Sequence, residues 1–450
     1  MARFKHIETA PVPERALIVG VDTGASDWPL EASMDELARL VETADGVVVA
    51  RETQRLDAPV PKTFVGSGKA RELADIVRRM DVDVVVFDDE LTPSQQANLE
   101  KVFGDPVKVI DRTALILDIF GRHARTREGR LQVQLAQLQY LLPRLRGMWS
   151  HLMGEQTRGG IGSRFGQGES QLEVDRRLVR DRIAQLRREL ARLEVRRTTQ
   201  SKARWDSGIW RVAFAGYTNA GKSTLLNALT DSAVYAKDEL FATLDPTTRS
   251  IDLAEGRKIT LTDTVGFIQK LPTTLVESFK STLAEVKAAD LILLVVDARD
   301  DGWRKKREAV TSILEQIGAG DVRRVLVFNK ADLLTDEERE SLVVECPDSV
   351  MASAVTGYEL SGLLHRVALE ASRGDRTLTA CIPYQKGLLI KMAHERCQVV
   401  REHYEEAGLV VTVKASERMA ATLAPYEVGD KAKVSSVPSV DNEPTTSTGE

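Results

Sequence analysis

A glycine-rich segment followed by lysine and serine has the spacing of a phosphate-binding loop. Residues 216–223, Gly-Tyr-Thr-Asn-Ala-Gly-Lys-Ser, fit the pattern G-x-x-x-x-G-K-[ST], with an apolar strand before it and a helical pattern after it. The loop's N–H groups and the helix N-terminus would then face one anion. We expect Gly216 and Gly221 to permit the tight turn, Lys222 to span two phosphates, and the Ser223 hydroxyl to ligate Mg²⁺.

Two further segments fall in order after this loop, each directly after a predicted strand. Asp263-Thr-Val-Gly266 follows the strand 259–262, so Asp263 can hold Mg²⁺ through water and the Gly266 N–H can reach a γ-phosphate. Asn329-Lys-Ala-Asp332 follows the strand 324–328. The Asp332 carboxylate can accept two hydrogen bonds from guanine, and adenine lacks that donor pattern. The sequence therefore predicts GTP, and not ATP, as the nucleotide.

Smaller contributions complete the predicted guanine site. Lys330 can lie over the base plane, and Asn329 can tie its loop to the phosphate-binding loop. Further along, Ser353-Ala354 can offer a backbone N–H to the guanine O6. Each short string alone is a weak signal, but their order and spacing together indicate a GTP site.

A second glycine–lysine string, Val-Gly-Ser-Gly-Lys-Ala, lies at 65–70. The position five residues before Gly68 is Thr63 where the pattern needs glycine, and Ala70 stands where a metal-binding hydroxyl is needed. We interpret this string as a turn that starts a helix, with no phosphate site.

The elements that must position these residues begin with an α/β segment and a pair of long helices. Residues 1–120 alternate Val/Ile-rich runs with helical periods, which is typical of a small parallel α/β domain. Residues 121–207 carry two apolar stripes that predict a long antiparallel helical hairpin with a Gly-rich tip at 154–168. The stripes are Leu131, Leu135, Leu138 and Leu142, and Val179, Ile183, Leu186, Leu190 and Leu193.

The second half of the chain resumes the strand–helix alternation. Residues 208–373 form the predicted P-loop domain, and 374–432 a small α+β domain in which 386–407 has the pattern of one helix. Residues 433–450 are rich in Ser, Thr and Pro and predict a disordered tail. The expected fold class is α/β, with an N-terminal small parallel α/β domain, a long antiparallel helical hairpin, a P-loop domain and a small α+β C-terminal domain.

Composition excludes several classes of protein. With 42% apolar and 29% charged residues in 450, the chain has an ordinary globular balance. Its longest aliphatic run, 291–296, is far below the ~20 residues of a membrane span, and its first residues lack a secretory h-region. Three scattered cysteines predict neither a disulfide framework nor a zinc site, and the histidines show no metal-ligand spacing. We expect a cytoplasmic protein, monomeric in solution.

Charge is distributed unevenly along the chain. The net charge is −5, yet residues 121–210 hold 19 Lys and Arg against 9 Asp and Glu, which gives +10 and leaves −15 for the rest. A basic block in an acidic protein indicates a polyanionic partner, either nucleic acid or an anionic membrane surface. Within the Gly-rich tip, Arg158 and Arg164 are the candidates for RNA contact.

Taken together, these motifs resemble the translation-factor-like class of small GTPases and, more narrowly, the HflX family. Residues 241–249 look like that family's switch I, 127–136 like its helix before the linker, and 159–177 like its linker signature. One departure is Arg164-Phe-Gly-Gln-Gly-Glu169, which is one residue longer than the usual Arg-Gly-Pro-Gly-Glu and lacks the proline. The resemblance implies a GTPase that binds the large ribosomal subunit and its RNA and helps to split stalled or idle ribosomes under stress.

The resemblance also implies a set of site residues. Thr243 would ligate Mg²⁺ beside Ser223, and Lys222, Thr243 and Gly266 would carry catalysis. The expected nucleotide contacts are Gly216, Tyr217, Thr218, Asn219, Ala220, Gly221, Lys222, Ser223, Thr224, Phe241, Ala242, Thr243, Leu244, Asp245, Asp263, Thr264, Val265, Gly266, Asn329, Lys330, Ala331, Asp332, Ser353, Ala354 and Val355.

Catalysis is expected to be slow without help. The residue after Gly266 is Phe267, which cannot orient water as the glutamine of Ras-like enzymes does. A ribosomal surface could order this segment, or a monovalent cation could assist, because Asn219 resembles the asparagine that binds K⁺ in related GTPases.

Two other functions are compatible with parts of the sequence. A membrane-surface regulatory GTPase would place the basic hairpin on anionic lipid, although its leucine seams should be buried in each other. An RNA-dependent ATPase would use the string at 65–70, against which Thr63 and Ala70 weigh. Co-sedimentation with ribosomes or with anionic liposomes distinguishes the ribosome-binding function from the membrane alternative. ATP binding by a fragment of residues 1–200 would support the ATPase alternative.

Overall fold

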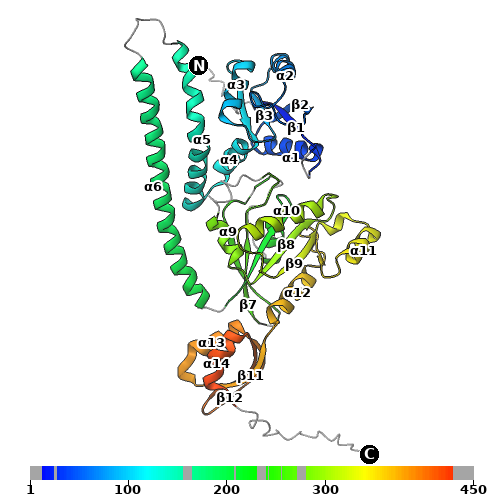
Figure 1. The fold of residues 1–450 in the computed structure, drawn as a ribbon. Helices are drawn as coiled ribbons and strands as arrows, with labels where there is room; N and C mark the ends of the chain where they lie inside the picture. Colours follow the sequence, from blue (N-terminus) through cyan, green and yellow to red (C-terminus); the bar gives the residue numbers. More distant parts are fainter. Residues whose placement is uncertain are drawn as a thin grey trace, which may run out of the picture. The chain divides into compact units, whose positions relative to one another are not determined.

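The computed structural model divides the chain into two compact units. One comprises residues 1–251 and 259–366, and the other 252–258 and 367–450. The residues described are 13–24, 28–155, 165–206, 209–230, 240–241, 243–254, 256–270 and 280–428. The expected α/β class is confirmed in the first unit, which contains a four-stranded and a six-stranded sheet with helices around them (Figure 1).

The N-terminal sheet has four parallel strands in the order β2-β1-β3-β4. Its Val-rich central strands are buried on both faces, as the continuous apolar runs predict. Side chains before two of the helices cap them: Thr92 in the loop after β3 caps α3, and the buried Asp111 at the end of β4 caps α4. The strands are β1 (Arg15–Asp22), β2 (Val47–Arg55), β3 (Val84–Phe87) and β4 (Lys108–Asp111), and the helices α1 (Leu30–Thr43), α2 (Ser67–Arg79), α3 (Pro93–Phe103) and α4 (Arg112–His123).

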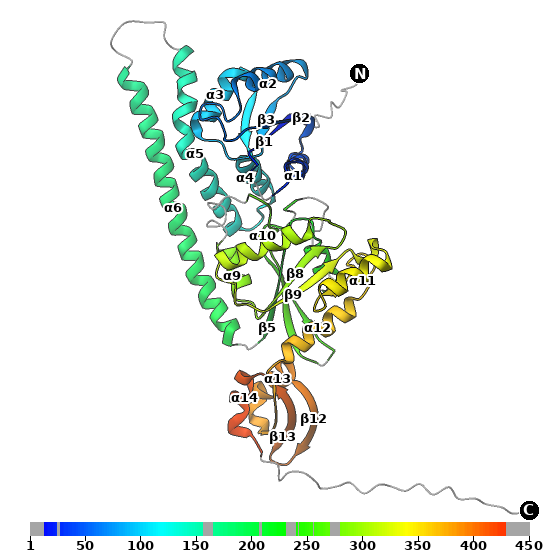
Figure 2. The same ribbon diagram turned by 45° about the vertical axis from the view of Figure 1, so that its right-hand side comes forward.

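The predicted hairpin is formed by α5 (Arg127–Glu155) and α6 (Phe165–Asp206), which lie antiparallel and side by side in Figures 1 and 2. The two leucine stripes face each other. Leu135, Ile183 and Leu186 are buried at their centre, with Leu131, Leu138, Leu142, Val179 and Leu190 packed around them.

The second sheet has six strands in the order β10-β9-β8-β5-β7-β6. The strands from β10 to β7 are parallel, and β6, joined to β7 by a short turn, is an antiparallel edge strand. Its centre, β8 and β5, is almost wholly buried, and the polar motifs follow the carboxyl ends of β5, β7 and β9. The strands are β5 (Trp210–Gly216), β6 (Thr247–Asp252), β7 (Lys258–Asp263), β8 (Leu291–Asp297), β9 (Arg324–Asn329) and β10 (Val350–Met351). The helices are α7 (Lys222–Thr230), α9 (Lys280–Lys287), α10 (Trp303–Gln316), η1 (Ala331–Leu333), α11 (Asp336–Glu345) and α12 (Leu360–Ser372).

The second unit contains a three-stranded antiparallel sheet in the order β11-β13-β12. Its apolar face is covered by residues of α13 and α14. The strands are β11 (Arg376–Ile382), β12 (Gln398–Glu405) and β13 (Gly408–Ala415), and the helices η2 (Tyr384–Lys386), α13 (Gly387–Arg396), α14 (Glu417–Leu423) and η3 (Ala424–Tyr426).

The prediction of one helix over 386–407 is wrong. The helix α13 ends at Arg396, and β12 pairs with β13 from Gln398 onward. The β-branched pair Val399-Val400 favours the strand, and Val399 lies opposite Val413 of β13, a long-range pairing that helical periodicity does not reveal. Gly408 makes the return possible, because a Cβ on it would lie 2.3 Å from the Ile382 carbonyl oxygen.

Candidate nucleotide site

The phosphate-binding loop joins β5 to α7, and its glycines are required by close backbone contacts. A Cβ on Gly216 would lie 2.2 Å from the Val295 carbonyl oxygen, and Gly221 has a φ of 85°. The buried Lys222 ammonium donates to the carbonyls of Gly216 (3.1 Å) and Tyr217 (2.9 Å). The lysine side chain is therefore held against the loop in which its ammonium group is expected to contact phosphate.

Three oxygen-bearing side chains meet beside this lysine. The Ser223 hydroxyl lies 2.5 Å from Asp263 Oδ2 and 2.7 Å from Thr243 Oγ1. The second carboxylate oxygen of Asp263 is buried without a hydrogen-bond partner. Hydroxyl and carboxylate oxygens are the ligands that Mg²⁺ prefers, so this donor set fits the ion.

Burial changes the pKa of both charged groups at this point. It lowers the pKa of Lys222 to about 8, although Asp263 opposes the change. It also raises the pKa of Asp263, against the effects of Lys222 and the Ser223 hydroxyl. A phosphate beside the ammonium and a cation beside the carboxylate would each favour the charged form, so the pair suits a site for a magnesium nucleotide.

On the guanine side, Asn329 connects two loops. Its Nδ2 donates to the Ala220 carbonyl (2.8 Å), and its Oδ1 accepts the Ala354 N–H (3.2 Å). Lys330 has a φ of 63° and pairs with Asp297 at 2.7 Å. The half-buried Asp332 carboxylate makes no hydrogen bond to any described residue, which leaves its oxygens open to a ligand.

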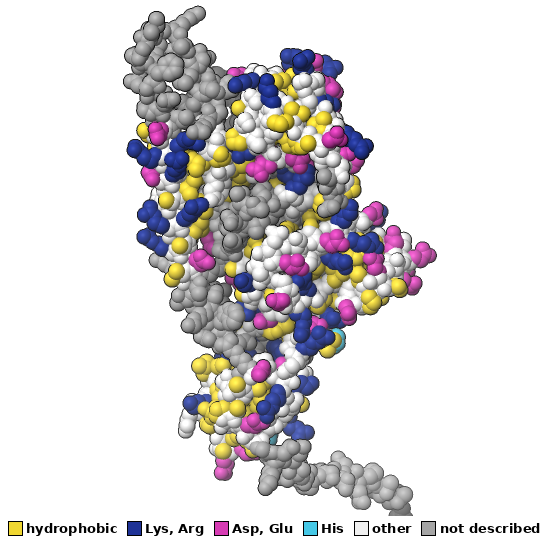
Figure 3. Space-filling model, viewed as in Figure 1, with side chains coloured by type: hydrophobic (Ala, Val, Ile, Leu, Met, Phe, Trp, Pro, Cys, Tyr) yellow, Lys and Arg dark blue, Asp and Glu magenta, His cyan; other side chains and the backbone are white. Residues whose placement is uncertain are grey.

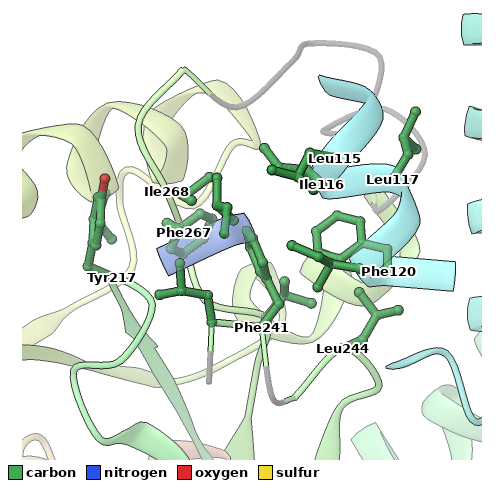
Figure 4. Packing of buried hydrophobic residues seen from close by; sticks show 14 of the residues in the cluster. Leu115, Ile116, Leu117, Phe120, Tyr217, Phe241, Leu244, Phe267 and Ile268 are labelled. Carbon is green, nitrogen blue, oxygen red and sulfur yellow. The ribbon is translucent and has the colours of Figure 1, made fainter. Parts of the chain in front are cut away.

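The segment expected to be switch I lies against the N-terminal domain. Phe241 and Leu244 are buried in a cluster with residues of α4, and Figure 4 shows Phe120 and Ile116 facing them. The Asp245 carboxylate accepts the Arg125 N–H at 2.8 Å, so this side chain holds the start of α5. Ala242 lies outside the described residues.

The segment after Asp263 is bound to the phosphate-binding loop by its backbone. The Thr218 N–H donates to the Phe267 carbonyl (2.7 Å), and the Phe267 N–H donates to the Gly216 carbonyl (3.1 Å). A Cβ on Gly266 would lie 2.7 Å from Thr218 Cγ2, so only glycine fits there. The Thr264 hydroxyl turns away and donates to the Phe214 carbonyl (2.6 Å).

A buried network that sequence reasoning missed joins α1 and α4 to this segment. Arg112 pairs with Glu36 (2.6 Å) and with Asp88 (2.7 Å), and the Tyr217 hydroxyl donates to Glu36. That hydroxyl also accepts the Gln269 N–H at 2.6 Å. The one available signal was Arg112, three residues before the apolar stretch 115–117, since a buried arginine needs buried carboxylates.

The buried charges stabilise one another. Burial opposes ionisation of Asp88, yet Arg112 and Lys270 prevail and hold its pKa below the usual value for a carboxyl group. Lys270 forms an ion pair with Asp88 at 2.6 Å. Because Asp88 directly follows β3, this pair connects the segment after Phe267 to the N-terminal sheet. The N-terminal domain therefore touches both the expected switch I and the segment that follows Asp263.

The string at 65–70 is occupied by structural contacts. Gly66 precedes α2, and its N–H donates to Gln54 Oε1 (2.9 Å). Lys69 pairs with Glu52 (2.5 Å) and Glu72 (3.0 Å). Its charge is already compensated, as suits a turn that starts a helix.

A parallel sheet that presents a phosphate-binding loop, an Asp-x-x-Gly turn and an Asn-Lys-x-Asp loop at its carboxyl ends defines a P-loop GTPase. Residues 31–121 match the GTP-binding GTPase N-terminal family, 123–204 the GTP-binding GTPase middle region, and 211–330 the family described as 50S ribosome-binding GTPase. The chain belongs to the HflX family of GTPases, and it hydrolyses GTP.

Two relatives illustrate the extent of the similarity. GTPase HflX of Magnetococcus marinus is 42% identical over 410 residues, which cover 90% of this chain and 94% of the relative. GTPase HflX of Escherichia coli K12 is 45% identical over 379 residues, covering 84% and 88%. Within the part of the chain that the structure describes, no helix has the length and apolarity needed to cross a bilayer.

Proposed function

We propose that this GTPase is a switch that binds the large ribosomal subunit and its RNA and dissociates stalled or idle ribosomes under stress. The observation that carries the proposal is the basic face of α6, in the same compact unit as the nucleotide site. The helix ends at Asp206, only four residues before β5 begins at Trp210 and leads into the phosphate-binding loop.

The exposed side of α6 suits a polyanion. Arg177, Arg180, Arg187 and Arg188 are exposed, and Figure 3 shows basic side chains spaced along this helix. Arginine binds phosphate oxygens through paired donors, which favours RNA as the partner. The proposed RNA-facing residues Arg158 and Arg164 lie outside the described residues.

Within the nucleotide site, we assign Mg²⁺ to the Ser223 and Thr243 hydroxyls, with Asp263 acting through water. The ion would neutralise charge on the β- and γ-phosphates. Asn219, with a φ of 61°, stays our candidate for K⁺. The remaining residues predicted to bind GTP keep that role in the proposal.

The test removes the hairpin tip. Deleting residues 158–167 should leave GTP affinity unchanged, because the phosphate-binding loop is a separate element, while weakening co-sedimentation with large subunits. Arg158→Ala with Arg164→Ala should have a milder effect and lower the salt dependence of binding by roughly one phosphate contact per arginine. Equal ribosome affinity of the deletion and the parent at two salt concentrations would overturn the proposed role of the tip.

The membrane alternative predicts a different result in the same experiment. Co-sedimentation is also measured with liposomes of phosphatidylglycerol and phosphatidylcholine in place of ribosomes. Burial of Leu135, Ile183 and Leu186 between the helices removes the apolar surface that insertion into a bilayer interface would need. We therefore expect the parent to sediment with ribosomes and not with the vesicles.

A further inference from the structure

A cavity of about 770 Å³ borders the phosphate-binding loop on the side of the N-terminal domain. Its lining includes Thr218 and Asn219 from the loop, Leu240 beside switch I, Lys306 from α10, and Arg39 from α1. A smaller hollow beside it is again lined by Arg39, Thr218 and Asn219. One arginine of the N-terminal domain thus faces the loop that holds phosphates.

Helix α1 is fixed at both ends of this cavity. The Glu36 carboxylate accepts the Tyr217 hydroxyl in the phosphate-binding loop, and the Thr43 hydroxyl accepts the Leu240 N–H at 3.4 Å. Arg39 lies three residues after Glu36 and four before Thr43, so the three side chains share one face of the helix. That face runs from the phosphate-binding loop to switch I, and Arg39 stands between the two.

The charges around the cavity leave Arg39 without a partner. Among the described residues, its guanidinium makes no hydrogen bond or ion pair, and the Thr218 hydroxyl oxygen nearby is buried and unpartnered. Four of the five acidic residues that line the cavity are already paired with other cations. The pairs are Asp35–Arg51, Glu36–Arg112, Asp297–Lys330 and Asp300–Lys306.

We propose that the Arg39 guanidinium contacts the γ-phosphoryl group of GTP bound in the same chain and stabilises the charge that develops during hydrolysis. In that step water attacks the γ-phosphorus and forms a P–O bond, while the bond from this phosphorus to the bridging oxygen breaks. The bridging oxygen leaves with its electron pair on GDP, and the protons of the water pass to inorganic phosphate and solvent. Arg39 transfers no proton and acts by charge alone.

A contact from Arg39 would compensate for Phe267, which stands where Ras-like enzymes have a water-orienting glutamine. A buried phenylalanine cannot hold the attacking water, so the site needs its electrostatic stabilisation from elsewhere. Lys222 supplies one cation from within the loop, and Arg39 supplies a second from outside it. An arginine provided in cis plays the same part in other P-loop GTPases.

The experiment compares Arg39→Ala, Arg39→Lys and the control Arg71→Ala, an exposed arginine of α2 that does not line the cavity. Single-turnover GTP hydrolysis is measured at saturating protein, with GDP affinity and binding of the transition-state mimic GDP–aluminium fluoride as further readouts. We expect Arg39→Ala to lower the rate and the affinity for the mimic at least ~10-fold, with GDP affinity within about twofold of the parent.

Further outcomes separate a direct contact from a structural role. Arg39→Lys should recover part of the rate, and free guanidinium at millimolar concentration should partly rescue Arg39→Ala. An unchanged rate, a faster rate, or equal loss of affinity for GDP and for the mimic would overturn the proposal. If Arg39→Ala melts well below the parent, Arg39→Gln with the same readouts decides, because its side chain keeps polar packing without the charge.

Discussion

The rings of Phe120 and Phe241 meet edge to face, with centroids 4.6 Å apart and an interplanar angle of 80°. Phe120 belongs to α4 of the N-terminal domain, and Phe241 stands at the start of switch I with a φ of 58°. A residue expected to follow the nucleotide is therefore held inside the core of another domain. Movement of switch I must disturb this aromatic pair.

Phe120→Ala should uncouple the two segments. Removing a fully buried aromatic side chain leaves a cavity and costs about 3–5 kcal/mol of unfolding free energy. We expect the lowest thermal transition to fall and limited proteolysis near Phe241 to accelerate. Tyr384→Ala, at an exposed aromatic residue of the second unit, is the matched control and should change neither. A parent-like proteolysis pattern in Phe120→Ala would contradict the proposed coupling.

Asp88→Asn should destabilise the protein at neutral pH. The substitution leaves Arg112 buried without one of its carboxylates, which costs about 3–5 kcal/mol. Asp88 has a lowered pKa in the folded state, so its contribution is present above the ordinary carboxyl pKa and is lost as pH falls through the lowered value. Melting temperature measured from pH 7 to pH 3 should therefore fall more steeply in the parent. Coincident curves for parent and variant would show that the pair contributes nothing.

Asp332→Asn should change the base specificity. The carboxylate that we predict accepts two hydrogen bonds from guanine becomes an amide, and GTP affinity should drop by about 2–4 kcal/mol. Xanthosine triphosphate should bind better than GTP, because its base offers an acceptor to the new N–H group. Fluorescence titration with both nucleotides measures the change. Parent-like GTP affinity would mean that another residue reads the base.

Lys222→Ala and Ser223→Ala should abolish hydrolysis while leaving the fold intact. Both side chains are expected to act on phosphate and metal, and neither belongs to the hydrophobic clusters. Turnover assays with Mg²⁺, together with circular dichroism, test the two parts of this expectation. Normal turnover in either variant would show that the phosphate-binding loop has been assigned wrongly.

Hydrophobic periodicity predicted most of the fold. The buried strands β1, β3, β5, β8 and β9 and the leucine seams of α5 and α6 follow from spacing, because each of these elements buries one side or both. The short or mostly exposed strands β6 and β10 were not predicted. The strand β12 was missed, because most of its side chains are exposed and its strand conformation rests on backbone pairing with β13, while its residues also suit a helix.

The nucleotide site was predictable for the opposite reason. Gly216, Lys222 and Ser223 sit close together in sequence, so their geometry is local. The contacts of Tyr217 with Glu36, and of Arg112 with Asp88, join residues separated by 181 and 24 positions. A single sequence does not show which residues such pairings join, and for that reason the proposed role of α1 beside the phosphates rests on the three-dimensional structure.

The turn between β6 and β7 affects the design of truncated variants of this protein. Arg257 in that turn is buried, donates to the Ala371 carbonyl at 2.6 Å, and forms an ion pair with Asp375. These partners lie more than a hundred residues further along the chain, inside the unit that a truncation at the end of the GTPase region would remove. A truncated protein would thus expose Arg257, which is buried in the full chain. Deletion studies of the C-terminal region therefore need Arg257 replaced by a small polar residue before any loss of function is ascribed to the missing part.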